Sequence, residues 1–374
     1  MLARLGLAAV VLFAGCGDDG GGGSAPAPVV LHETYFTQTA DDWTIAVHHY
    51  HRSTGVAYAE PVFMSGGYLE NHRVFDAFPR HSLIGELALS GFDVWTYDIR
   101  GTGQSQSPEV GDLFGWTFSA DEFIKYDTPA ALDFVRRTTG AAQVNWVAHS
   151  MGATMLYGYL ERYDPSHVKN AVTLGGVGML SDEAALESGF GDLFFQIGTF
   201  LLPFIPSNMP LPLRWALDQL LAEDPWRWAA ICYALDSFLG RLFWSDEAVN
   251  PNLIYQFLTK GLCNTSTNVF KQFLRWARDG RVVGDDGYDY TANLPRITTP
   301  ICVMSGGGDQ MVKVADCRYV YDRIASTDKQ WVECSKATGH TYDFGHVDMV
   351  LGLKAQAEVY GHVTGFLTAR STAR

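Results

Sequence analysis

The sequence predicts an α/β fold, in which helices cover both faces of a mostly parallel sheet and a helical segment is inserted between two parts of the core. Short apolar runs alternate with helical segments up to residue 177, as parallel strands require crossover connections. The alternation stops over residues 178–294, where leucine-rich and aromatic stretches are punctuated by prolines. Apolar runs return after that. We therefore expect a core of residues 29–177 and 295–374, with residues 178–294 as a helical cap or lid.

Composition agrees with a large folded protein that does not bind nucleic acid. The chain has 374 residues, of which 47% are hydrophobic and 18% charged, which is too apolar for a disordered chain. Its formal net charge is −14 and it contains no run of basic residues. Because binding to phosphates needs clustered Lys and Arg, this composition argues against a nucleic-acid partner.

The first 28 residues have the pattern of an export signal followed by a tether. Residues 1–15 contain one cation, Arg4, and then an apolar run too short to span a bilayer. The run ends in Ala14-Gly15-Cys16, which resembles the lipobox of bacterial lipoproteins and predicts lipidation of Cys16; an ordinary secretory signal is the alternative. Residues 16–28 are rich in Gly, Ser, Ala and Pro, as flexible tethers are. We expect an exported lipoprotein, anchored in the outer membrane or cell envelope of a bacterium.

The core elements follow in order. Residues 29–52 alternate in polarity and predict a β-hairpin. His48, His49 and His51 lie in it, but adjacent strand residues point to opposite faces, so His48 and His49 cannot chelate one metal together. Next come strands over residues 61–68, 92–99, 144–149 and 168–175, separated by helices over residues 82–90, 121–138 and 151–160. After the cap, strands over residues 300–306 and 330–335 alternate with helices over residues 314–325 and 349–368.

The cap is unusually apolar. Helical stretches are predicted over residues 193–204, 213–221, 226–243 and 269–277. The first of these is more apolar than one inward-facing helix needs. Its side chains form either the core of the cap, or a wall for acyl chains or a surface that contacts lipid.

The segment from Val144 to Ala153 has the sequence form of a nucleophile elbow. An apolar strand ends at His149, Ser150 follows, and a helix begins at once. Ala148 and Gly152 flank the serine, where strand and helix backbones leave room for small residues only. An ordinary helix N-cap is the alternative interpretation of Ser150.

A serine nucleophile requires a base and a carboxylate that orients the base. In open parallel sheets such groups lie in loops at the carboxyl ends of strands. Asp309 follows the strand over residues 300–306, and His346 follows the last strand and opens the terminal helix; His340 is the weaker alternative base. The order Ser150, Asp309, His346 agrees with that of α/β-hydrolases.

Other polar residues near these strands receive supporting roles. Asp98 is the rival carboxylate, but it precedes Ser150 in the chain, and we interpret it as structural, bracing the Arg100-Gly101 turn. His149 is expected to point away from Ser150 and to shape the pocket. The backbone N–H groups of Met151, which begins a helix, and of Tyr68, which follows two glycines, are the expected oxyanion donors.

The cysteines predict no metal site. Five remain after Cys16, and none forms a Cys-x-x-Cys pair. An exported protein meets an oxidising compartment, and Cys232 with Cys263 is the expected disulfide. No metal and no organic cofactor is expected.

Together these segments resemble the acid lipase family of α/β-hydrolases, which includes gastric and lysosomal lipases. The resemblance is carried by residues 63–69, 82–95, 126–134, 148–152 and 345–348. It implies Ser150 as nucleophile, Asp309 and His346 as its partners, Tyr68 and Met151 as oxyanion donors, and a mobile helical cap. The chain departs from the family at Gly66-Gly67, where the family has His-Gly.

The expected function is a serine carboxylic-ester hydrolase, a lipase or esterase that forms an acyl-enzyme. Its expected partners are a small-molecule or lipid ester and a membrane, reached through the N-terminal lipid anchor and through the cap. An acyltransferase, a thioesterase and an amidase are alternatives on the same residues. A binding protein that keeps the fold without catalysis is the alternative from another class.

Overall fold

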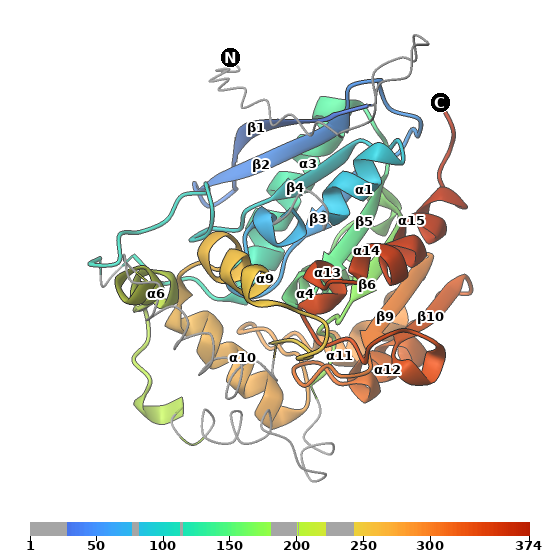
Figure 1. Cartoon of the computed structure of the whole chain (residues 1–374). Coiled ribbons are helices and arrows are strands. Elements are labelled where there is room, and N and C mark those ends of the chain that lie inside the picture. Colours follow the sequence, from blue (N-terminus) through green and yellow to red (C-terminus); the bar gives the residue numbers. More distant parts are fainter. Residues whose placement is uncertain (1–27, 77–81, 113–114, 181–199, 201, 222–242) are drawn as a thin grey trace.

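The computed structural model describes residues 28–76, 82–112, 115–180, 200, 202–221 and 243–374 (Figure 1). The predicted signal peptide, Cys16 and all but the last residue of the tether lie outside this part. So do most of the helix predicted over residues 193–204 and nearly all of that over residues 226–243. Within the described ranges, no helix is both long enough and apolar enough to cross a bilayer.

One eight-stranded sheet forms the centre of the molecule. Its strands lie in the order β1-β2-β4-β3-β5-β6-β9-β10. The last six strands in this order run parallel to one another. β1 and β2 form an antiparallel hairpin, and β2 pairs antiparallel with β4. The strand bounds are β1 (Val30–Gln38), β2 (Thr44–Arg52), β3 (Val62–Ser65), β4 (Val94–Tyr97), β5 (Val144–His149), β6 (Val168–Leu174), β9 (Ile301–Gly306) and β10 (Lys329–Cys334). The predicted α/β-hydrolase fold, with its mostly parallel sheet, is confirmed.

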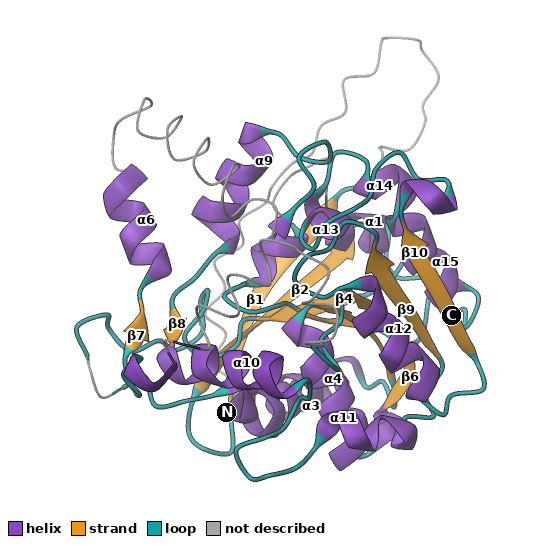
Figure 2. Ribbon diagram, turned by 90° about the horizontal axis from the view of Figure 1, so that it is seen from below, coloured by secondary structure: helices purple, strands orange, loops and turns teal. Residues whose placement is uncertain are grey.

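Helices cover both faces of the sheet, as Figures 1 and 2 show. α1 (Leu83–Leu89) and α15 (Tyr360–Thr368) pack together on one face, while α3 (Thr128–Thr139) and α4 (Met151–Arg162) pack together on the other. Strand side chains alternate between the two resulting cores: Trp146 joins the one that holds α3 and α4, and Val147 the one that holds α1 and α15. α12 (Val314–Arg323) joins β9 to β10.

Two helices predicted as continuous are interrupted. The first is α2 (Ala120–Glu122), a π-helical turn η2 (Phe123–Asp127) and then α3. The C-terminal one consists of α13 (Asp348–Leu351), α14 (Ala355–Glu358) and α15. Gly352 ends α13 with an extended backbone, and a Cβ there would lie 2.4 Å from the carbonyl oxygen of Asp348. The glycine therefore permits a close backbone contact that ends the helix.

The inserted segment enters and leaves the core at one point. The hydroxyl of Thr291 donates to the carbonyl of Gly178, 2.8 Å away, so the two ends of the insertion meet. Its described elements are η5 (Leu202–Phe204), β7 (Pro210–Leu211), α6 (Leu213–Leu221), α9 (Pro251–Gln256), η7 (Phe257–Gly261), β8 (Thr265–Ser266), α10 (Thr267–Asp279) and α11 (Tyr290–Asn293). α6 and α10 confirm the helices predicted over residues 213–221 and 269–277.

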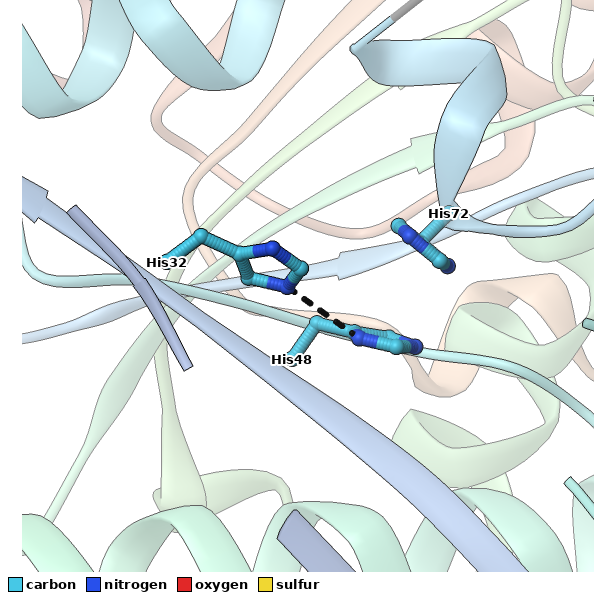
Figure 3. A group of neighbouring side chains, drawn as sticks. All are labelled: His32, His48 and His72. Carbon is cyan, nitrogen blue, oxygen red and sulfur yellow. Dashed lines mark hydrogen bonds between the residues drawn. The ribbon is translucent and has the colours of Figure 1, made fainter. Parts of the chain in front are cut away.

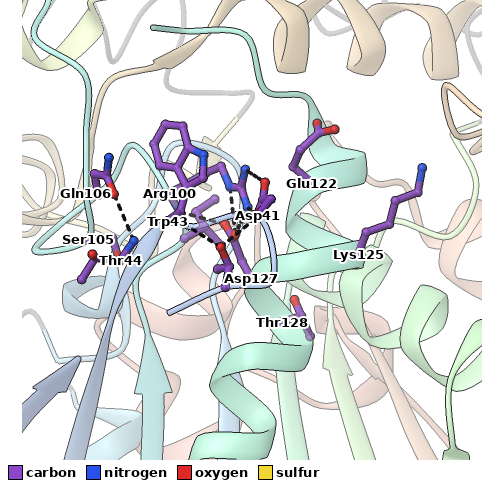
Figure 4. A network of polar contacts seen from close by, with 12 residues as sticks. Asp41, Trp43, Thr44, Arg100, Ser105, Gln106, Glu122, Lys125, Asp127 and Thr128 are labelled. Carbon is purple, nitrogen blue, oxygen red and sulfur yellow. Dashed lines mark hydrogen bonds and ion pairs between the residues drawn. The ribbon is translucent and has the colours of Figure 1, made fainter. Parts of the chain in front are cut away.

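A buried arginine fixes the loop after β4 (Figure 4). The guanidinium of Arg100 contacts both carboxylate oxygens of Asp41, at 2.6 and 2.8 Å, and Oδ1 of Asp127 at 2.7 and 2.8 Å. Asp98 does not contact Arg100; it accepts from the N–H of Gln104, 2.8 Å away. Asp98 therefore does brace this loop, as predicted, but it does so through Gln104. Arg100 is held by the carboxylates of Asp41 and Asp127 instead.

The expected Cys232–Cys263 disulfide is wrong. Cys263 is a buried free thiol, as are Cys302, Cys317 and Cys334 in the described part of the chain, whereas Cys232 lies outside that part. The sulfur of Cys263 accepts hydrogen bonds from the side chain of Asn71 at 3.2 Å and from the N–H of Gly103 at 3.4 Å. The thiol therefore faces loops of the core, and its burial raises its pKa to about 11.

Candidate active site

Ser150 sits in a strained turn between β5 and α4. Its φ is +56° and its ψ −126°, a conformation that costs a non-glycine residue free energy and that clusters at functional sites. A Cβ at Gly152 would lie 2.3 Å from the carbonyl oxygen of Ser65, and a Cβ at Gly67 would lie 2.7 Å from the Cβ of Ser150. Glycine at both positions lets the loop after β3 approach the serine closely.

The structure brings Ser150, His346 and Asp309 together. Nε2 of His346 lies 2.7 Å from the hydroxyl of Ser150, and Nδ1 lies 2.8 Å from Oδ2 of Asp309. Asp309 in turn accepts from the N–H groups of Met311 and Val312, each at 2.8 Å. A carboxylate only accepts, so Nδ1 carries the imidazole hydrogen and the lone pair of Nε2 faces the serine. This arrangement can remove the proton of the serine hydroxyl.

The rival residues lie elsewhere. Nδ1 of His340 pairs with the hydroxyl of Thr338 at 3.1 Å. Asp98 is enclosed by His48 and His72 and takes no part in the Ser150 cluster. Each of the three predicted residues follows its own parallel strand, β5, β9 or β10, so their meeting results from the sheet topology.

A buried ion pair lies beside this cluster. Nδ1 of His149 contacts Glu70 at 3.0 Å, and Nε2 donates to the carbonyl of His346 at 3.1 Å. Both partners are acceptors, so the ring carries two hydrogens and a positive charge. Burial alone would lower the pKa of His149, but the charge and hydrogen bond of Glu70 raise it above its ordinary value. The hydrogen-bond partners of the His149 ring are thus Glu70 and the backbone of His346, and Glu70 was not foreseen.

Glu70 lies in the loop after β3, and its carboxylate accepts from the N–H of Gly67 in the same loop. Through Glu70 and His149, this loop is thus connected to the backbone of His346. No local pattern in the sequence marks Glu70. Its role depends on the register that places β3 beside β5.

The two predicted oxyanion donors belong to different elements, α4 and the loop after β3. Met151 begins α4 directly after Ser150, and Tyr68 follows Gly67, whose Cα borders the serine. The ring of Tyr68 stacks on Phe273 of α10 with centroids 5.7 Å apart. Its hydroxyl is buried without a hydrogen-bond partner among the described residues, and burial raises its pKa well above the ordinary value.

Asp348 is a further carboxyl close to His346. It is fully buried, its Oδ2 accepts from the N–H of Ser245 at 2.9 Å, and its Oδ1 has no hydrogen-bond partner in the described structure. Burial, helped by the negative charge of Asp309, raises the pKa of Asp348 to about 8. It is therefore protonated at neutral pH.

Comparison with known proteins agrees with the architecture. Residues 60–352 match the α/β hydrolase fold family. Mouse gastric triacylglycerol lipase is 25% identical over 314 residues, covering 76% of this chain and 74% of its own. Lipase 3 of Drosophila melanogaster is 25% identical over 367 residues, covering 90% and 89%.

Among solved structures, a thermophilic esterase from Thermogutta terrifontis superposes with a TM-score of 0.58 at 14% identity, covering 91% of this chain and 99% of its own. A monoacylglycerol lipase from Paleococcus ferrophilus gives 0.56 at 15% identity, covering 88% and 100%. These structural likenesses show the fold. With the sequence match spanning residues 60–352, the chain belongs to the α/β hydrolase fold family and, within it, resembles the gastric lipases.

Proposed function

We propose that this protein hydrolyses carboxylic esters through a covalent acyl-enzyme on Ser150. The single observation that carries the proposal is the continuous set of contacts from the serine hydroxyl through His346 to Asp309, at 2.7 and 2.8 Å. The strained backbone of Ser150 supports it further, because such strain exposes the hydroxyl at a nucleophile elbow. Its relatives that are named lipases support the same reaction class.

The chemistry follows from the positions of the hydrogens. Nε2 of His346 takes the hydroxyl proton as Ser150 Oγ attacks the ester carbonyl carbon, and Asp309 stabilises the imidazolium that forms. The N–H groups of Tyr68 and Met151 stabilise the oxyanion. Collapse expels the alcohol, which receives the proton from His346. Water, deprotonated by the same Nε2, then attacks the acyl-enzyme and releases the acid.

The substrate we favour is a lipid or another ester with an acyl chain. Phe200, Phe204 and Trp215 of the inserted segment are 76%, 74% and 51% exposed, far more than core residues of a cap would be. Exposed aromatic side chains close in sequence favour contact with an apolar phase. The named activities of the relatives agree with this choice.

We also propose that the protein is exported and held at a bacterial membrane through Cys16 and the tether that follows. The proposal rests on the sequence pattern of residues 1–28 alone. Wild-type protein should fractionate with membranes, and Cys16→Ser should lower the membrane-bound fraction. Equal partition of both would contradict anchoring at Cys16.

A fluorophosphonate probe tests the nucleophile. Wild type should be labelled and should lose ester hydrolysis on labelling, whereas Ser150→Ala should show neither. Ser305→Ala is a matched control, because Ser305 is buried in β9 and its hydroxyl has no hydrogen-bond partner among the described residues. Equal labelling of wild type and Ser150→Ala would reject the proposal. Product analysis with a competing alcohol separates hydrolysis from acyl transfer, and a folded sample without turnover on a broad ester panel would favour a binding protein.

A further inference from the structure

Three histidines from three separate elements meet beside the β1–β2 hairpin (Figure 3). His32 lies on β1, His48 on β2, and His72 opens the short helix η1 (His72–Phe75) after β3. One nitrogen from each ring lies within 4.8 Å of the others. His48 and His72 are buried and His32 is partly buried, so the cluster is reached from solvent on the side of His32.

Asp98 determines which nitrogens of the two buried rings carry hydrogen. Its two oxygens contact Nε2 of His48 and Nδ1 of His72, each at 2.9 Å, and they also accept from the N–H groups of His72 and Gln104. A carboxylate accepts hydrogen bonds from these groups, so in neutral rings Nδ1 of His48 and Nε2 of His72 carry the lone pairs.

Hydrogen bonds within the protein do not use both lone pairs. Nδ1 of His48 has Nε2 of His32 at 3.3 Å and the hydroxyl of Thr34 at 3.2 Å. Nε2 of His72 is buried and has no partner in the described residues. A buried acceptor without a donor costs free energy, which is why such groups are rare in folded proteins. The orphaned nitrogen therefore points to a missing ligand.

Two of the rings also have the hydrogen-bond partner that metal-bound histidines usually have. Neutral imidazole is the form that coordinates a metal. Metal-bound histidines characteristically give their second N–H to a carboxylate, and Asp98 has that relation to two of the three rings here.

We propose that His32, His48 and His72 bind a zinc ion, with Asp98 as the carboxylate that orients His48 and His72. Three imidazoles with an open fourth position form an established zinc ligand set. Zn–N bonds of about 2.05 Å in a tetrahedron place the nitrogens about 3.3 Å apart, and the nearest nitrogens of His32 and His48 already stand at 3.3 Å. The rings of His48 and His72 stack with centroids 3.6 Å apart, so these two rings would separate when they bind the ion. His32 and His48 come from one hairpin and His72 from η1, so the ion would tie these elements together.

The site has a structural consequence for the loop that carries Tyr68. His72 follows Tyr68 by four residues, and Asn71 between them caps η1 through a 2.8 Å bond from the N–H of Arg73. Zinc at His72 would therefore hold the C-terminal end of the loop after β3 against the hairpin. The proposal does not depend on the reaction at Ser150.

The test uses the full chain, produced without a polyhistidine tag, stripped with chelator and titrated with zinc chloride against a chromogenic zinc chelator. Wild type should bind about one zinc ion per chain and unfold at a higher temperature with zinc than without. His32→Gln and His72→Gln should lose both the bound zinc and the thermal shift. His51→Gln is the matched control and should keep both, because residue 51 projects from the other face of β2 than residue 48.

Two results would overturn the proposal. One is a wild-type protein that takes no zinc and shows no thermal shift at micromolar free zinc. The other is stoichiometric binding that persists in His32→Gln and His72→Gln, which would place the ion elsewhere. If His72→Gln does not fold, His32→Gln decides, because its side chain is only partly buried. Fluorophosphonate labelling of each variant shows whether the Ser150 site is intact.

Discussion

Replacing Asp348 by asparagine should stabilise the protein, and increasingly so as the pH rises. Asparagine has the shape of a protonated carboxyl and keeps an oxygen for the N–H of Ser245. The remaining oxygen of Asp348 has no hydrogen-bond partner in the described structure, so its replacement breaks no bond. The substitution removes a group that must otherwise hold a proton in order to stay buried.

The magnitude follows from the pKa of about 8 in the folded state against an ordinary value of 3.8. Between these values the folded chain binds one more proton at Asp348 than the unfolded chain does. Stability therefore falls by about 1.4 kcal/mol for each pH unit. The stability that the proton on Asp348 contributes is fully present below the pKa of this group in the unfolded state, and it is lost as the pH rises through the pKa in the folded state. At pH 7 the free energy of unfolding is therefore lowered by at most about 4 kcal/mol through Asp348.

Urea unfolding at pH 5, 6 and 7 measures this. The free energy of unfolding of Asp348→Asn minus that of wild type cancels the contributions of the other titrating groups, such as Glu161, whose burial raises its pKa to about 9. That difference should grow by about 1.4 kcal/mol per pH unit, with an unchanged slope on urea concentration. A difference that is constant from pH 5 to pH 7 would mean that Asp348 is ionised in the folded protein, and would refute the reasoning.

Two further substitutions probe the loop after β3. Gly152→Ala should lower stability by about 1–3 kcal/mol and slow fluorophosphonate labelling, because its Cβ would lie 2.3 Å from the Ser65 carbonyl oxygen. Gly361→Ala is the control and should do neither, because a Cβ there has nothing within 4 Å. Equal labelling rates of the two variants would contradict this prediction. Glu70→Gln should cost about 1.5–3 kcal/mol and lower kcat more than it changes KM. Because the pKa of His149 is raised in the folded protein, the stabilisation from the His149–Glu70 ion pair is present at acidic pH and lost as the pH rises through that pKa. The loss of stability in Glu70→Gln should therefore shrink at alkaline pH. A loss of stability that does not change with pH would exclude the ion pair.

The succession of strands and helices along the chain and the residues of the Ser150 cluster were predictable because both depend on local patterns. Apolar runs mark the strands, and parallel strands bring their carboxyl ends to one edge whatever their spacing in the chain. Asp309 and His346 needed no more than that rule. Alternation along β2 likewise separated His48 from His49 correctly.

What escaped prediction depends on partners that are distant in sequence. His48 meets His72 and His32 only once β1, β2 and η1 are assembled, and neither histidine lies near it in the chain. The π-helical turn that ends at Asp127 has no periodic signature, yet it carries the carboxylate to Arg100. The interruption at Gly352 did have a local signal, a glycine within an apolar helical pattern.

Because Gly178 and Thr291 are in contact, the inserted segment begins and ends at one place and can be exchanged as a unit during evolution. Two chain ends that already touch can be joined by a short or a long connection without moving the sheet that holds Ser150, His346 and Asp309. An exchanged insertion keeps the reacting groups in place only if it also reproduces the hydrogen bonds beside His346, from the N–H of Val347 to the carbonyl of Phe243 and from the N–H of Ser245 to Asp348. The same junction is the place at which a grafted insertion from a relative would give this core a new substrate preference.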